Sequence, residues 1–153
     1  MAKNIIWSIF FVFIVTPLFS QNIGDSKFKI QLNEKNKFGG ESSSFYSSYD
    51  ELLTYVVADE AHYIYYYIKD GICVGISEKV VGNDLRSTYD LYNDILASND
   101  FGRVLSRHED YTCFVKSGIK YRVSIRKSLI RKNSWDVLID RGNEVQNTGN
   151  YGC

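Results

Sequence analysis

The stretch HYIYYYIKDGICVGIS, residues 62–77, decides the fold. Its first half is rich in tyrosine and isoleucine, which favour the pleated surface of a β-sheet. The pair Asp70-Gly71 suits a tight hairpin turn, because both residues tolerate the positive φ angles that this turn requires. Beyond the turn, apolar side chains alternate with other residues from Ile72 to Ile76. The stretch therefore predicts a β-hairpin.

Three tyrosines lie on one face of the first hairpin strand, because successive side chains of a strand point to opposite faces. This face carries Tyr63, Tyr65 and Tyr67, and the other face carries Ile64, Tyr66 and Ile68. One face must pack against helices, and the second is either covered by the chain itself or exposed. An exposed tyrosine strip would bind a protein or a polysaccharide, because aromatic rings offer a large contact area at a small entropic cost.

Two segments that flank the hairpin predict helices. Before it, Ser48 and Glu51 have the spacing of a capping box, and apolar residues recur on one helical face over residues 48–60. After it, Asn83 is the expected N-cap of a helix over residues 84–98. The apolar stripe of this second helix consists of Leu85, Tyr89, Tyr92 and Leu96, with Ile95 beside it.

Four segments further along the chain predict the strands of an antiparallel meander. They are residues 103–107, 111–116, 119–127 and 135–140. We therefore expect an α+β fold, in which two helices pack on one face of a mainly antiparallel sheet of five or six strands. The order of elements would be helix, hairpin, helix and meander. This single domain would comprise residues 48–140, and residues 141–153 would form a loose C-terminal tail.

A weak internal echo links two parts of the sequence. Lys69-x-Gly71-Ile72 recurs as Lys116-x-Gly118-Ile119, and the surrounding residues are partly similar. The echo has two interpretations. Either a helix-and-hairpin unit is used twice along the chain, or two unrelated hairpins share the same turn chemistry.

The N-terminal residues have the pattern of a secretory signal peptide. Lys3 precedes an apolar run from Ile5 to Val15, which is too short to cross a membrane comfortably. Pro17 then ends the run, and a small residue suited to cleavage follows. We therefore expect residues 1–20 to be removed on export to the periplasm or the exterior, which leaves no transmembrane segment. The alternative is an uncleaved N-terminal anchor.

Residues 21–47 follow the expected signal peptide and predict a flexible polar leader. They include the stretch GGESSS, whose composition is typical of a linker. Within this leader, Phe28, Ile30 and Leu32 alternate with polar residues. This short piece could therefore add an edge strand to the sheet.

Basic residues are concentrated late in the chain. Residues 111–134 contain seven basic residues and no acidic one, although the formal net charge of the whole chain is zero. One face of the strand 119–127 carries Lys120, Arg122 and Arg126, and the series continues through Lys127, Arg131 and Lys132. Either Asp136 and Asp140 on a neighbouring strand compensate these charges, or the face binds an acidic partner. The balanced total gives no reason to expect a nucleic acid.

The chain has three cysteines, and an exported protein can keep disulfides. A Cys73–Cys113 bridge would join two strands of the sheet. The third, Cys153, would then be available for a bond between two chains, which would give a disulfide-linked dimer. The alternative is that all three thiols are unpaired.

Few residues suggest catalysis. The candidates are His62, His108 and Cys113 with nearby acidic residues, which could assemble a small hydrolase or thiol enzyme. The two histidines lack the helical spacing of a zinc motif, and the chain has no phosphate-binding glycine loop, so we expect no cofactor. We therefore favour a non-enzymatic binding or interaction module. A structural envelope-associated protein linked through Cys153 is the remaining alternative.

Overall fold

The computed structural model describes residues 23–35, 41–46, 49–57, 61–129, 131–142 and 153. The expected signal peptide, residues 1–20, lies outside the described residues, as do residues 143–152 of the expected tail. Within the described part of the chain, no helix has both the length and the apolar character needed to span a bilayer.

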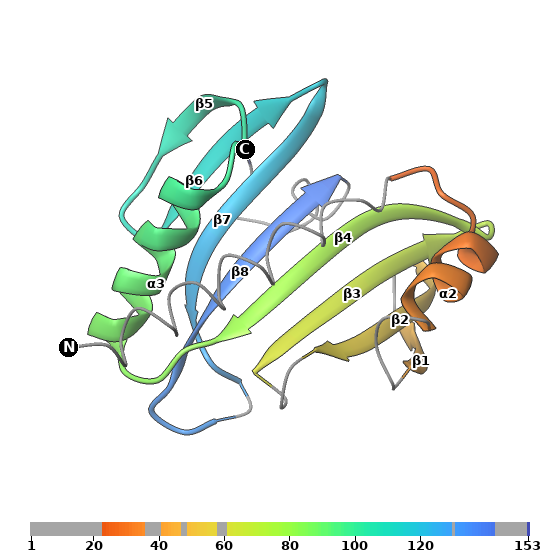
Figure 1. Ribbon diagram of the computed structural model, residues 1–153, viewed down its shortest axis with the longest axis horizontal. Coiled ribbons are helices and arrows are strands. Elements are labelled where there is room, and N and C mark those ends of the chain that lie inside the picture. The colour runs from red at the N-terminus through yellow and green to blue at the C-terminus, as the bar shows by residue number, and fades with distance from the viewer. Residues whose placement is uncertain (1–22, 36–40, 47–48, 58–60, 130, 143–152) are drawn as a thin grey trace, which may run out of the picture.

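The described residues form one antiparallel sheet of eight strands and two helices. In chain order the elements are α2 (Lys27–Lys35), β1 (Glu41–Tyr46), β2 (Tyr49–Val57), β3 (His62–Lys69), β4 (Ile72–Val81), α3 (Leu85–Ser98), β5 (Arg103–Arg107), β6 (Tyr111–Lys116), β7 (Ile119–Lys127) and β8 (Trp135–Gly142). Across the sheet the strand order is β1-β2-β3-β4-β8-β7-β6-β5 (Figure 1). The prediction of five or six strands was therefore wrong, because β1 and β2 come from segments that were expected to be a leader and a helix.

The element order repeats a helix followed by a four-stranded meander. The first unit is α2 with β1–β4, the second is α3 with β5–β8, and the two units join where β4 pairs with β8 at the centre of the sheet (Figure 1). In both units the segment before the helix bonds to the start of the fourth strand. The backbone N–H of Cys73 donates to the carbonyl of Asp25 at 2.9 Å, and that of Trp135 donates to the carbonyl of Asn83 at 3.2 Å.

The echo in the sequence does not follow this repeat. It aligns the β3–β4 turn with the β6–β7 turn, which occupy different positions in the two units. Both turns have two successive positive φ angles, 52° and 73° at Asp70-Gly71 and 51° and 77° at Ser117-Gly118. This is the conformation that a two-residue hairpin turn requires. The echo therefore reflects shared turn chemistry.

Both helices cover the same face of the sheet. Ile30 of α2 packs in a buried cluster that includes Ile76 of β4, and Ile95 of α3 packs in a second cluster that includes Val80 of β4. Ile76 and Val80 are four residues apart on one strand and therefore point to the same side. We call the opposite side the helix-free face.

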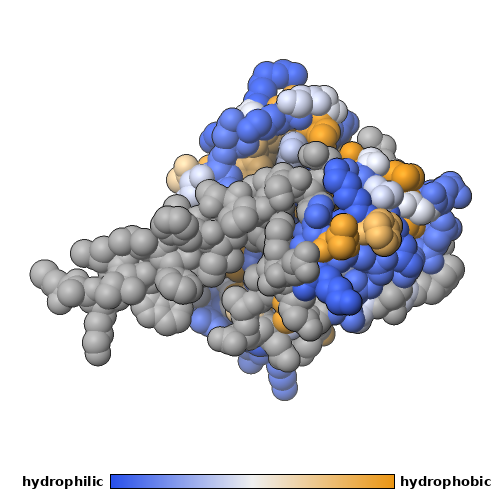
Figure 2. All heavy atoms as spheres, turned by 45° about the vertical axis from the view of Figure 1, so that its right-hand side comes forward, coloured by the Kyte–Doolittle hydropathy of each residue, from blue (hydrophilic) through white to orange (hydrophobic). Residues whose placement is uncertain are grey.

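The helix α2 replaces the edge strand expected near residues 28–32. Its first turn is capped, because the Ser26 hydroxyl accepts from the Lys29 backbone N–H at 3.3 Å. Ile30 and Glu34, one helical turn apart, are its buried residues. Phe28 and Leu32 are exposed. On the face shown in Figure 2, small hydrophobic areas are bordered by hydrophilic residues. The alternation of apolar and polar residues in this segment therefore did not predict which side chains are buried.

The helix predicted over residues 48–60 was wrong, because this segment forms β2. Leu53 and Tyr55 face the helices and are buried, whereas Leu52 and Val56 lie on the helix-free face. A segment that is apolar on both faces satisfies helical spacing as well as strand spacing. Pairing with β3 decides between the two conformations.

The second half of the chain follows the predictions closely. The helix α3 and the strands β5, β6 and β7 lie where the sequence places them, and β8 begins as expected but extends to Gly142. The N-cap of α3 is Asp84 rather than Asn83, since the Asp84 carboxylate accepts from the Ser87 N–H at 3.0 Å. This hydrogen bond is the main cause of the lowered pKa of Asp84.

The disulfide joins Cys113 and Cys153, which corrects both cysteine predictions. Cys73 is buried and unpaired, and Cys153 is bonded within the chain rather than to a second chain. Two strands separate β4 from β6, which places Cys73 and Cys113 roughly 14 Å apart at about 4.8 Å per strand. This separation is far beyond the reach of a disulfide.

The lone thiol of Cys73 should be inert in the folded chain. Burial raises its pKa from 9.0 to about 11. At pH 8 we therefore expect alkylation by iodoacetamide to be roughly a hundredfold slower in the native state than in urea, as followed by mass spectrometry. The same shift stabilises the fold fully below pH 9.0, and this contribution is lost as the pH rises toward 11. Rapid labelling of native Cys73 at pH 8 would contradict its burial.

Candidate binding face

Two tyrosines of β3 form a half-buried pair on the helix-free face. The rings of Tyr63 and Tyr65 are nearly parallel, with an interplanar angle of 12° and centroids 6.3 Å apart. Thr54 and Val56 stand directly opposite them on β2, and Val56 is 39% exposed. We call these four residues the tyrosine patch. It is the part of the predicted strip that remains accessible.

The ammonium group of Lys79 is held against this ring pair. Lys79 is opposite Tyr63 in the β3–β4 register, and its Nζ lies 4.2 Å from the Tyr63 centroid and 5.9 Å from the Tyr65 centroid. Only 9% of Lys79 is exposed, so its charge faces the rings instead of bulk water. Such a cation–π contact fixes the rings in place. Burial, and next the charge of Asp136, raise the pKa of Tyr65, which keeps that phenol neutral.

The third tyrosine of the predicted strip is not accessible. Tyr67 is 8% exposed, and its ring packs against Tyr49 of β2 with centroids 5.0 Å apart. The strip is therefore a pair of tyrosines, and Tyr67 supports the sheet beside them.

The predicted basic face is neutralised inside the molecule. Arg122 has 0% exposure, and its Nη2 donates to the Asp140 carboxylate at 2.5 Å. The other oxygen of Asp140 accepts from the Ser77 hydroxyl at 2.6 Å. These three side chains form a buried row across β7, β8 and β4 on the helix-free face.

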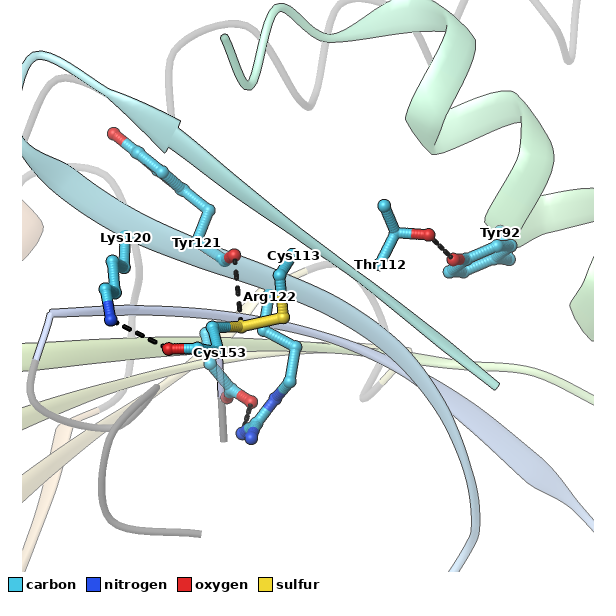
Figure 3. Close-up of a disulfide and its surroundings, with 8 residues drawn as sticks. Tyr92, Thr112, Cys113, Lys120, Tyr121, Arg122 and Cys153 are labelled. Atoms are coloured by element: carbon cyan, nitrogen blue, oxygen red, sulfur yellow. Dashed lines mark hydrogen bonds and ion pairs between the residues drawn. A yellow bond between two sulfur atoms is a disulfide. The ribbon is translucent and has the colours of Figure 1, made fainter. Parts of the chain in front are cut away.

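Two further basic candidates, Lys120 and Arg126, also have partners within the chain. Lys120 Nζ donates to the backbone carbonyl of Cys153 at 2.7 Å, close to the disulfide (Figure 3). Arg126 is half-buried and stands opposite Asp136 in the β7–β8 register. The register places Asp140 opposite Arg122 and Asp136 opposite Arg126, and Arg122 forms an ion pair with Asp140.

A second polar group lies on the opposite face, between the two apolar clusters. His62 Nε2 is 3.6 Å from Glu78 Oε2, and both side chains are buried. Nearby, the Tyr66 phenol is hydrogen-bonded to Glu34 of α2. Burial is the main cause of the raised pKa of Tyr66, and the carboxylate of Glu34 adds to it. These groups belong to the junction between the two units.

The structure does not bring the candidate catalytic residues together. Five inter-strand steps separate β3, which carries His62, from β5, after which His108 follows. At about 4.8 Å per step the two lie roughly 24 Å apart. Cys113 is in the disulfide, so it offers no thiolate nucleophile. Among the described residues, no cluster of three or more His, Cys, Asp or Glu side chains could hold a metal ion.

Sequence reasoning missed Lys79 on this face and Glu78 on the opposite face. Both lie within β4, but their charges resemble the end of a strand. Ser77 was assigned to the strand without its bond to Asp140. The signal that could have found Lys79 is its spacing from Ser77 along the strand, since every second residue of a strand points to the same face.

We compared the chain with family models, with curated proteins and with solved structures, and found no match in any of the three. Functional inference therefore starts from the geometry of the sheet and its two faces.

Proposed function

We propose that this chain is an exported, non-enzymatic module that captures a protein partner with the tyrosine patch on the helix-free face. The observation that carries the proposal is the parallel Tyr63–Tyr65 pair, with the ammonium of Lys79 fixed 4.2 Å from the Tyr63 ring centre. Tyrosine is enriched among the residues that contribute most to protein–protein affinity.

The two tyrosine rings are restricted before any partner binds, which supports a binding role for this pair. Both rings are half-buried, and Lys79 beside them is almost fully buried, so few rotamers remain to be lost when a partner arrives. Immobilising flexible side chains at an interface costs free energy, and a fixed aromatic pair avoids most of that cost. Thr54 and Val56 extend the patch over β2, which gives the rings a mixed polar and apolar border.

The surface of a sheet suits a protein partner better than a small ligand. Small-molecule sites are concave and bury most of the ligand, whereas protein interfaces are commonly built around a few aromatic anchors. Export is supported by the signal-like N-terminus of the sequence. The Cys113–Cys153 bridge fits an oxidising compartment, in which disulfides persist.

The test is capture of partners from the envelope and medium of the host, with the double variant Tyr63→Ser/Tyr65→Ser compared with the unchanged chain. We expect at least about a tenfold loss of affinity for the captured protein. A tenfold loss corresponds to a binding free energy of only about 1.4 kcal/mol, which the loss of two aromatic anchors should exceed. Val56→Glu should weaken capture similarly without removing a ring. Circular dichroism checks that each variant keeps its fold.

The matched control is Tyr89→Ser, which removes a half-buried tyrosine from α3 on the opposite side of the sheet. It should leave capture unchanged. Equal capture by the control and the double variant would reject the proposal, as would unfolding of Tyr63→Ser/Tyr65→Ser together with normal capture by Val56→Glu. Loss of a bound polysaccharide instead of a protein would reject the stated class of partner.

A further inference from the structure

The loop between β7 and β8, described at residues 128–129 and 131–134, projects beyond the end of the sheet (Figure 1). Its ends are held together, because the Ser128 N–H donates to the Ser134 carbonyl at 2.9 Å. Inside it, the Arg131 N–H donates to the Ser128 hydroxyl at 3.2 Å, and the Ser134 hydroxyl donates to the Arg131 carbonyl at 3.1 Å. The described part of the loop is therefore a braced turn.

This turn exposes a large apolar side chain to solvent. Leu129 is 101% exposed, the highest value among the exposed large hydrophobic residues of the described chain. Lys127, Arg131 and Lys132 surround it in sequence and are exposed as well. No acidic residue occurs between residues 111 and 134. Among its described residues, the tip therefore combines a fully exposed leucine with three exposed cations.

The base of the loop adds further apolar surface. Trp135 is half-buried and stands opposite Lys127 in the β7–β8 register. Its backbone bonds to Asn83, and Leu85, two residues later at the start of α3, is 42% exposed. Tryptophan is favoured where an apolar phase meets water, because its ring is apolar and its N–H is polar.

We propose that this loop docks the protein on an anionic lipid surface. Leu129 enters the apolar layer, while Lys127, Arg131 and Lys132 contact the headgroups and Trp135 lies at the boundary. One tip offers far less area than a stable protein–protein interface needs. Membrane docking, in contrast, needs only an apolar insertion and several nearby cations. The inference does not rest on the tyrosine patch, whose residues belong to β2 and β3.

The first test is sedimentation of the exported form of the chain with vesicles of phosphatidylcholine, with and without an equal part of phosphatidylglycerol. We expect binding only to the anionic vesicles. Leu129→Ser should lower the partition coefficient about tenfold, and so should Arg131→Glu/Lys132→Glu. The matched controls are Leu105→Ser and Arg103→Glu/Arg107→Glu on the edge strand β5, where a leucine and two arginines are also exposed. These controls should bind normally.

The second test reports insertion of the tip itself. A tryptophan introduced by Leu129→Trp should be quenched by lipids brominated on their acyl chains, and one introduced by Leu105→Trp should not. If neither residue is quenched, or if Leu129→Ser binds like the unchanged chain, the proposal is wrong. Equal binding to polyglutamate and to anionic vesicles, without dependence on Leu129, would instead indicate an acidic protein partner and would also overturn it.

Discussion

Replacing Arg122 with alanine should lower the free energy of unfolding by about 3–5 kcal/mol, because it leaves the buried carboxylate of Asp140 without its cation. The Ser77 hydroxyl would still donate to Asp140, but one neutral hydrogen bond does not compensate a buried charge. Urea denaturation followed by circular dichroism measures the loss. In a thermal scan we expect the midpoint to fall by roughly 10–20 °C.

A paired replacement distinguishes the buried charge from simple loss of packing. Arg122→Met/Asp140→Leu removes both charges and keeps most of the volume, so it should be much less damaging than Arg122→Ala. Arg126→Ala is a second comparison, because Arg126 is only half-buried on the same face. A cost below about 1 kcal/mol for Arg122→Ala, typical of an exposed ion pair, would show that Arg122 is solvated.

Loss of the Cys113–Cys153 bridge is the second large effect. The two cysteines are 40 residues apart, so the chain-entropy estimate for Cys153→Ser is a loss of about 3–4 kcal/mol. Reductant should destabilise the unchanged chain by a similar amount and should leave Cys153→Ser unaffected. On non-reducing gels the unchanged chain should migrate as a monomer.

Cys73→Ala provides the matched control for the bridge. It removes a buried thiol, so it changes core packing, but the variant should remain as sensitive to reductant as the unchanged chain. Peptide mapping without reduction identifies the pairing directly. A covalent dimer, or a peptide that links Cys73 to either of the other two cysteines, would contradict the structure.

The sequence predicts the fold from the β3–β4 hairpin onward better than the segments before it. Asp70-Gly71, the alternation after it and the apolar stripe of α3 are local signals, and each one specifies its own element. The segment at residues 49–57 lacks such a signal, because apolar side chains on both faces fit a helix and a strand equally well. Its conformation depends on β3, which supplies its hydrogen bonds from further along the chain.

The proposed binding face could be predicted only in part for the same reason. Strand alternation places Tyr63 and Tyr65 on one face of β3 and Arg122 with Arg126 on one face of β7, and the sheet order puts both on the helix-free side. Alternation does not reveal which neighbour lies across each strand. The positions of Lys79 beside Tyr63 and of Asp140 beside Arg122 follow from the order β3-β4-β8-β7, which joins segments far apart in the sequence.

The central pairing of β4 with β8 also determines how the molecule can assemble. Hairpins within each meander form between segments that are near in sequence. Residues 75–81, however, can pair only after residues 136–142 have been synthesised, and this pairing joins the two meanders. Contacts between distant segments slow folding. Until β8 arrives, β4 and β7 both present open edges, onto which other strands can add. Newly made chains should therefore be most prone to aggregation just before this last strand joins, and chaperones would be most useful at that stage.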